Sequence, residues 1–134
     1  MKKIKTGFSM VELLFVMAVM AALAAIAIPN LSGGQDAATA TALKSDAKNF
    51  INTVNAEKLL NDGSVIITDS VADGDTYGSH AVHFTDATTT IAMADESGTC
   101  TEGYSIKVEN SAFTTKDVTY NSCTDSAPKL VAGT

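Results

Sequence analysis

The sequence contains no arginine and no tryptophan, and its aromatic residues are five phenylalanines and three tyrosines. All nine basic residues are therefore lysines, and three of them, Lys2, Lys3 and Lys5, stand before Gly7. The chain after Gly7 carries six lysines against fifteen aspartates and glutamates. Recognition of nucleic acid needs clustered lysine and arginine to neutralise phosphates. We therefore expect no nucleic-acid partner for this acidic body.

The sequence also lacks the patterns that carry catalysis or bind a cofactor. It has no glycine-rich phosphate loop, and no serine has the histidine and aspartate context of a hydrolase triad. His80 and His83 form an H-x-x-H pattern, but residues three apart on a strand point to opposite faces, and no third zinc ligand stands nearby at a suitable spacing. We expect no enzyme and no cofactor, and interpret both histidines as surface or edge residues.

A long apolar run occupies residues 8–28, and Glu12 is its only charged side chain. As a helix, these 21 residues would extend roughly 30 Å, about the thickness of a bilayer's hydrocarbon core. The lysines before the run and the acidic chain after it favour a cytoplasmic N-terminus and an exported remainder. Because an ionised carboxylate is costly in hydrocarbon, Glu12 needs a partner or a function.

The alternative interpretation of this run is a secretory signal peptide. Triplets of the A-x-A type occur at residues 22–24 and 25–27. Two features argue against it: Glu12 would weaken insertion, and the run is longer than the ~7–15 apolar residues of most signal peptides. A retained membrane helix explains the pattern better.

The start of the chain resembles a known family. Residues 2–7 read KKIKTG and residues 8–14 read FSMVELL, which is similar to the class III leader of type IV prepilins and pseudopilins. The likeness extends through AAIAIPN at residues 24–30, although Ala21 stands where family members often carry glycine. The resemblance implies that a prepilin peptidase cuts between Gly7 and Phe8 and methylates the new amine of Phe8. It also implies that this amine pairs with Glu12, in its own chain or in a neighbour.

The resemblance further implies a structural role. The chain is expected to be a subunit of a type IV pilus-like filament, a homo-oligomer whose partners are the peptidase, an assembly ATPase and an inner-membrane platform. It would span the inner membrane once before assembly and lie in an extracellular pilus, or a periplasmic pseudopilus, afterwards. The alternatives are a pseudopilin of a type II secretion system and a minor pilin that acts in adhesion or DNA uptake.

The helix is expected to change character after the membrane. Pro29 removes one helical hydrogen bond, so we predict a kink or local melting between about residues 24 and 35. Apolar residues then recur at helical spacing on one face, namely Ala40, Leu43, Ala47, Phe50, Ile51 and Val54. The predicted division is a leader at residues 1–7, a transmembrane and polymerisation helix at 8–29, and a globular domain at 30–134.

The rest of the chain predicts a small antiparallel sheet packed on that helix, an α+β fold of the pilin type. Alternation is clear at residues 104–108 and 118–120, which we expect to form a hairpin, and further strands are predicted at 65–68, 81–85 and 89–93, with a loop at 69–79. The hairpin would bring Cys100 and Cys123 together. In an exported domain these two cysteines most simply form a disulfide, and free thiols are the alternative. A C-terminal disulfide is also a feature of type IV pilins.

Three aspartates are the available candidates for a calcium ion. Asp69, Asp73 and Asp75 lie close together in sequence and could supply carboxylate oxygens. The full EF-hand pattern is absent, and a solvated Asp/Gly turn explains these residues equally well. We therefore predict no metal site.

Overall fold

The protein divides into two compact units, residues Met1–Asp36 and Ala37–Thr134. The computed structural model describes residues 8–96, 98 and 100–133. For residues 28–33 it describes the backbone and not the side chains. Gly7 and the three leader lysines lie outside the described residues. A single helix, α1 (Met10–Leu60), contributes residues to both units.

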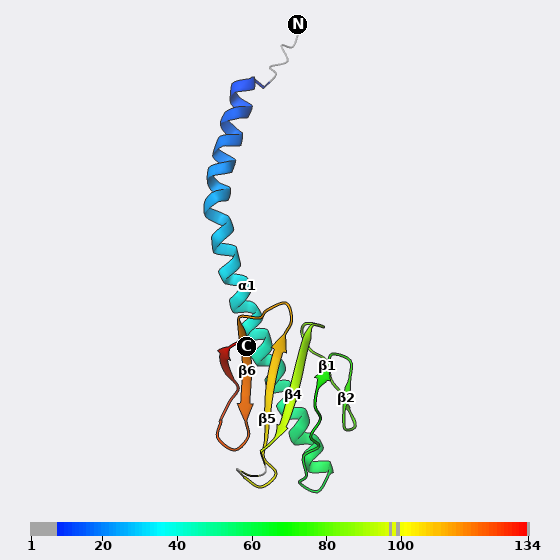
Figure 1. Cartoon of the computed structure of the whole chain (residues 1–134). Helices are drawn as coiled ribbons and strands as arrows, with labels where there is room; N and C mark the ends of the chain where they lie inside the picture. Colours follow the sequence, from blue (N-terminus) through cyan, green and yellow to red (C-terminus); the bar gives the residue numbers. More distant parts are fainter. Residues whose placement is uncertain (1–7, 97, 99, 134) are drawn as a thin grey trace. The chain divides into compact units, whose positions relative to one another are not determined.

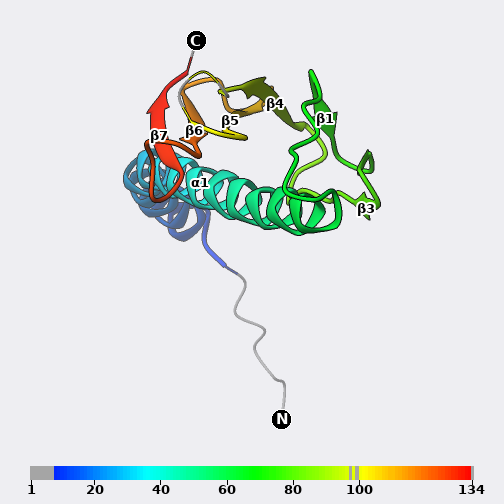
Figure 2. The same cartoon turned by 90° about the horizontal axis from the view of Figure 1, so that it is seen from below.

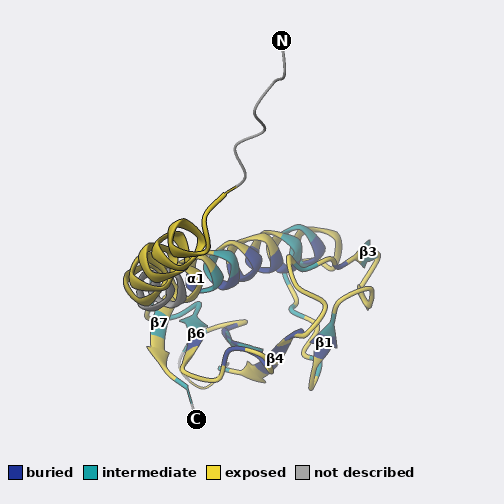
Figure 3. Cartoon of the chain, turned by 90° about the horizontal axis from the view of Figure 1, so that it is seen from above, coloured by how far each residue is buried: buried dark blue, intermediate teal, exposed yellow. Residues whose placement is uncertain are grey.

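In the first unit, the described chain is helical from Met10 onward. Alanine, leucine and methionine dominate this stretch, and all three are strong helix formers. Every side chain at residues 8–27 is exposed, as the yellow helix of Figure 3 shows. The backbone of Pro29 lies within α1, and its side chain is not described. The kink predicted near Pro29 stays a prediction.

In the second unit, the remaining turns of α1 bury the predicted apolar face. The six residues of the stripe are all buried, which confirms this part of the prediction: Ala40, Leu43, Ala47, Phe50, Ile51 and Val54. Exposed polar residues such as Ser45, Asn52 and Asn55 occupy the other side of the helix. Figures 1 and 2 show the strands lying along one side of this part of α1.

The strands form one five-stranded antiparallel sheet and a separate two-stranded hairpin. The sheet has the order β1 (Val71–Ala72), β4 (Thr89–Asp95), β5 (Tyr104–Asn110), β6 (Lys116–Asn121) and β7 (Lys129–Ala132). The hairpin pairs β2 (Thr76–Tyr77) with β3 (His80–Ala81). An apolar helix face packed on an antiparallel sheet makes the fold α+β, as predicted.

The core of the second unit lies between the helix stripe and the inner face of the sheet. Ile91, Val108 and Val118 are fully buried and sit side by side on three neighbouring strands, as the pairs Ile91↔Val108 and Val108↔Val118 show. The hairpin predicted from the alternation at residues 104–108 and 118–120 is thereby confirmed. The predicted strand at 89–93 corresponds to β4, which continues to Asp95.

The predicted strand at residues 65–68 is wrong, since no strand is assigned there. Side chains supply its hydrogen bonds in place of a neighbouring strand. The Val65 amide donates to a Glu102 carboxylate oxygen at 3.3 Å, and the Tyr77 hydroxyl donates to the Ile66 carbonyl at 2.7 Å. A short run of β-branched residues was therefore a poor guide to backbone pairing at this position.

The predicted strand at residues 81–85 is mostly wrong for the same reason. Only Ala81 belongs to a strand, while the amides of Phe84 and Thr85 donate to the carboxylates of Asp73 (2.8 Å) and Asp46 (3.1 and 3.2 Å). The predicted loop at 69–79 contains the short strands β1 and β2, and β7 was not predicted.

The turn of the β2–β3 hairpin rests on a buried carboxylate from α1. Glu57 is 6% exposed, and its oxygens accept hydrogen bonds from the Ser79 amide (3.2 Å) and hydroxyl (2.9 Å) and from the Asn61 side chain (3.1 Å). Nδ1 of His80 lies 2.9 Å from the same carboxylate. The bonds from Ser79 hold the pKa of Glu57 below its usual value. Gly78 has φ +59° and passes close to this group.

Replacing Gly78 with alanine is expected to destabilise the second unit by about 2 kcal/mol or more. A Cβ there would overlap the Glu57 carboxyl group, which can move away only by giving up its bonds to Ser79 and Asn61, and the left-handed φ adds strain. Gly74→Ala is the matched control, because Gly74 also has a positive φ (+85°) but no atom within 4 Å of its added Cβ. Denaturant unfolding of the full chain in detergent should show the larger loss for Gly78→Ala. Equal losses would contradict the contact with Glu57.

Candidate functional site

The first candidate site is the exposed apolar part of α1. The segment Met10–Ala27 is long and apolar enough to cross a membrane by length and composition, and it lies near the N-terminus. Eight large apolar side chains of this segment are more than 60% exposed, among them Met10 at 85%, and so is the preceding Phe8 at 82%. A monomer that leaves such a surface open must bury it in lipid or against other chains.

The exposed segment also carries many small side chains. Ala18, Ala21, Ala22, Ala24 and Ala25 are all exposed. In lipid there is no hydrophobic force between helices, so close contact of small residues is what allows them to pack. This surface suits a bundle of several copies better than a single anchor.

The helix begins at a defined residue. Ser9 precedes the first helical residue, Met10, and its hydroxyl oxygen accepts a hydrogen bond from the Glu12 amide at 3.2 Å. The Ser9 carbonyl also accepts the amides of Glu12 (3.1 Å) and Leu13 (3.3 Å). This is an N-cap, and it places Glu12 in the first turn, where an acid is favoured by the helix dipole.

The structure thus brings Ser9 and Glu12 together at the start of the exposed helix, next to Phe8. Phe8 itself is not helical, and Glu12 is exposed. The predicted cleavage residue Gly7 lies outside the described residues. The roles predicted for Gly7, Phe8 and Glu12 stay predictions. Sequence reasoning did not single out Ser9, although the pattern S-x-x-E at residues 9–12 is the known signature of a capping box.

Residues 2–28 match the prokaryotic N-terminal methylation motif. The chain carries a class III prepilin leader. This leader is found in type IV pilins and pseudopilins, so the match confirms the resemblance seen in the sequence. The motif marks structural, pilin-like proteins, and it implies processing by a peptidase, anchoring in a membrane before assembly, and filament assembly. No curated protein and no solved structure matches the chain significantly.

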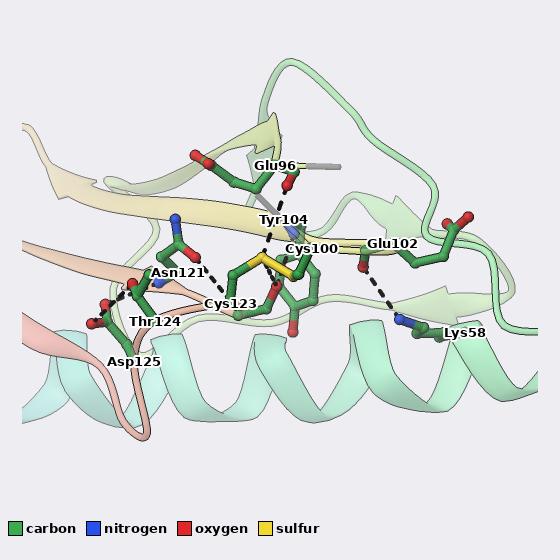
Figure 4. Close-up of a disulfide and its surroundings, with 10 residues drawn as sticks. Lys58, Glu96, Cys100, Glu102, Tyr104, Asn121, Cys123, Thr124 and Asp125 are labelled. Atoms are coloured by element: carbon green, nitrogen blue, oxygen red, sulfur yellow. Dashed lines mark hydrogen bonds between the residues drawn. A yellow bond between two sulfur atoms is a disulfide. The ribbon is translucent and has the colours of Figure 1, made fainter. Parts of the chain in front are cut away.

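The methylation motif covers the N-terminal fifth of the chain, and the second notable feature lies near the other end. Cys100 and Cys123 form a disulfide, shown in Figure 4, with their Cα atoms 5.8 Å apart. The hairpin of β5 and β6 holds the two residues near each other. Gly103 is packed beneath the bridge, because a Cβ there would lie 2.4 and 2.7 Å from the two sulfur atoms.

The disulfide region is also hydrogen-bonded to the end of α1. The Lys58 ammonium donates to the Glu102 carbonyl at 3.2 Å, and Figure 4 shows this contact beside the bridge. Glu102 adopts a positive φ of 53°, so its backbone is held in the left-handed region. On the other side of the bridge, the Cys123 amide donates to the Asn121 side chain at 2.8 Å.

The three aspartates considered for calcium do not form a shared site. Asp75 accepts the Ala72 amide at 2.8 Å and Asp73 accepts the Phe84 amide at 2.8 Å, so both carboxylates already bind backbone amides. His83 lies 3.6 Å from Asp73, and His80 faces Glu57. Among the described residues, no group of three histidine, cysteine or acidic side chains could hold a metal ion.

Proposed function

We propose that this chain is a structural subunit of a type IV pilus-like filament. The observation that carries the proposal is a prepilin leader joined directly to an apolar helix whose side chains are all exposed at residues 8–27. Such a helix needs lipid before assembly, and in a filament it finds other copies of itself. The proposed division is a leader at residues 1–7, a polymerisation helix at 8–29 and a globular domain at 30–134.

In this proposal, Glu12 sets the axial position of each subunit. Cleavage between Gly7 and Phe8 removes three lysines and creates one new amine at Phe8. This amine can still carry a positive charge after it is methylated. The buried Glu12 of an incoming subunit is paired only where the Phe8 amine of a neighbouring copy reaches it. Because an unpaired charge among apolar helices is strongly unfavourable, other positions are rejected.

The chain does none of the mechanical work of assembly in this scheme. A prepilin peptidase processes it, and an assembly ATPase with an inner-membrane platform moves it out of the membrane. The N-terminus faces the cytoplasm before assembly and the globular domain faces outward, in agreement with the basic leader and acidic body.

The disulfide favours a pilin over the alternative, a pseudopilin of a type II secretion system. Many major pseudopilins lack a C-terminal cysteine pair, whereas Cys100 and Cys123 here close the end of the sheet. A minor pilin that binds DNA would need a basic surface, and the globular part has far more acids than lysines.

Mass spectrometry of the protein from its native host tests the processing step. We expect a mature N-terminus at methylated Phe8, 14 Da heavier than the unmodified cleavage product, and we expect the chain to be the main protein of sheared surface appendages. An N-terminus after Ala24 or Ala27 would refute the prepilin processing. A processed chain confined to the periplasm, with secretion of exoproteins lost on deletion, would favour the pseudopilin.

A further inference from the structure

The N-cap residue Ser9 lies between Phe8 and Glu12, whose amine and carboxylate are the two groups on which the proposed assembly depends. Phe8 and Ser9 are both outside the helix, and α1 begins at Met10. The hydroxyl oxygen of Ser9 accepts the Glu12 amide at 3.2 Å. The cap therefore fixes where the helix starts, which keeps Phe8 outside it and holds Glu12 in its first turn.

The start of the helix matters for the charge of the mature chain. After cleavage, Phe8 carries a cationic amine one residue before the cap. The positive end of the helix dipole disfavours a cation at this place, whereas the carboxylate of Glu12 favours it. If the first turn frays, Glu12 loses its fixed position relative to the helix axis, and the carboxylate no longer presents one geometry to the amine of a neighbouring copy.

We propose that Ser9 is a positioning residue for the pair formed by Glu12 and the Phe8 amine. It acts through the backbone of Glu12 and contacts no partner chain itself. The inference rests on the proposed function, because that function supplies the pairing of Glu12 with Phe8. It adds a requirement to the proposed pairing: an oxygen acceptor at residue 9 that caps the helix.

Three single variants expressed in the native host test this inference. Ser9→Ala removes the acceptor, Ser9→Asn replaces it with an equally good cap, and Ser45→Ala makes the same chemical change at an exposed position of the same helix. The assembled fraction is measured in sheared filaments, and the mature N-terminus is checked by mass spectrometry. Amide exchange at Glu12 is measured by NMR on the mature full chain in detergent micelles.

We expect Ser9→Ala to reduce the assembled fraction and to speed Glu12 amide exchange, each about fivefold, with methylated Phe8 still present. Ser9→Asn and Ser45→Ala should stay within about twofold of the wild type. Unchanged assembly in Ser9→Ala, with faster exchange at Glu12, would overturn the positioning role. Equal losses in the alanine and asparagine variants would also overturn it, because capping would then not be the cause.

The parent proposal fails separately, through Glu12 itself. If Glu12→Ala assembled normally, the pairing would be wrong whatever Ser9 did. If Glu12→Ala failed to assemble while Ser9→Ala assembled normally, only the inference about Ser9 would fall.

Discussion

Glu12→Ala is expected to abolish filament assembly, or to leave disordered assemblies, while cleavage after Gly7 continues. The variant keeps the apolar helix and its cap, because Ser9 bonds to the backbone of residue 12 and not to its side chain. The processed subunit should therefore accumulate in the membrane. Sheared filaments and the membrane fraction, quantified side by side, measure the effect.

The size of the expected effect follows from what the variant leaves behind. Without Glu12, the Phe8 amine enters the bundle with no carboxylate to meet it. Removing one partner of a buried ion pair costs roughly 3–5 kcal/mol, which is more than a hundredfold in an association constant. Each subunit in the filament would bear this cost, so the loss is far larger than that expected for the cap.

Two further variants separate charge from packing. Glu12→Gln keeps the size of the side chain and removes its charge, and it should fail like alanine. Asp36→Ala removes an exposed acid from the same helix and should assemble normally. Regular filaments from Glu12→Ala or Glu12→Gln would show that an ion pair does not set the position of the subunits.

Loss of the disulfide is expected to have the largest effect on the globular unit. Cys100 and Cys123 are separated by 23 positions, and closing a loop of this length stabilises by about 3 kcal/mol on the chain-entropy model. For a unit of about a hundred residues, this corresponds to a fall in melting temperature of roughly 15 °C. Near-ultraviolet circular dichroism of the tyrosines, followed during heating in detergent, measures it.

The control for this experiment is chemical reduction. Wild-type protein treated with dithiothreitol should melt like the Cys100→Ser/Cys123→Ser variant, and the reductant should not change the melting of that variant. If the reduced and oxidised wild-type proteins melt at the same temperature, the bridge does not stabilise the fold. Assembly should be more sensitive to Glu12 than to the cysteines, since the bridge lies in the other unit.

The parts of the fold that sequence predicted well are those set by burial. The stripe from Ala40 to Val54 and the alternation in β5 follow from one buried face each, and in β5 a shift by one residue would expose the whole set. The N-terminal methylation motif was equally recognisable, because lysines, an apolar run of membrane length and a single acid stand together at the start of the chain. These features depend on residue type alone.

The parts that sequence did not predict are held by polar side chains that are distant in the chain. Glu57 holds the turn at Ser79, and Asp46 holds the backbone of Thr85, at separations of 22 and 39 residues. Both acids are buried, and nothing in a local pattern shows that they point inward. The Ser9 cap was local and could have been predicted from S-x-x-E at residues 9–12.

The wholly exposed segment at residues 8–27 also bears on the energetics of polymerisation. In the proposed filament, this segment passes from one apolar surrounding, the lipid, to another, the neighbouring helices. Such a transfer changes its contact with water very little, so the hydrophobic effect contributes little to the equilibrium. If the proposal holds, filament growth is then governed by a few polar contacts and by the energy that the proposed assembly ATPase supplies.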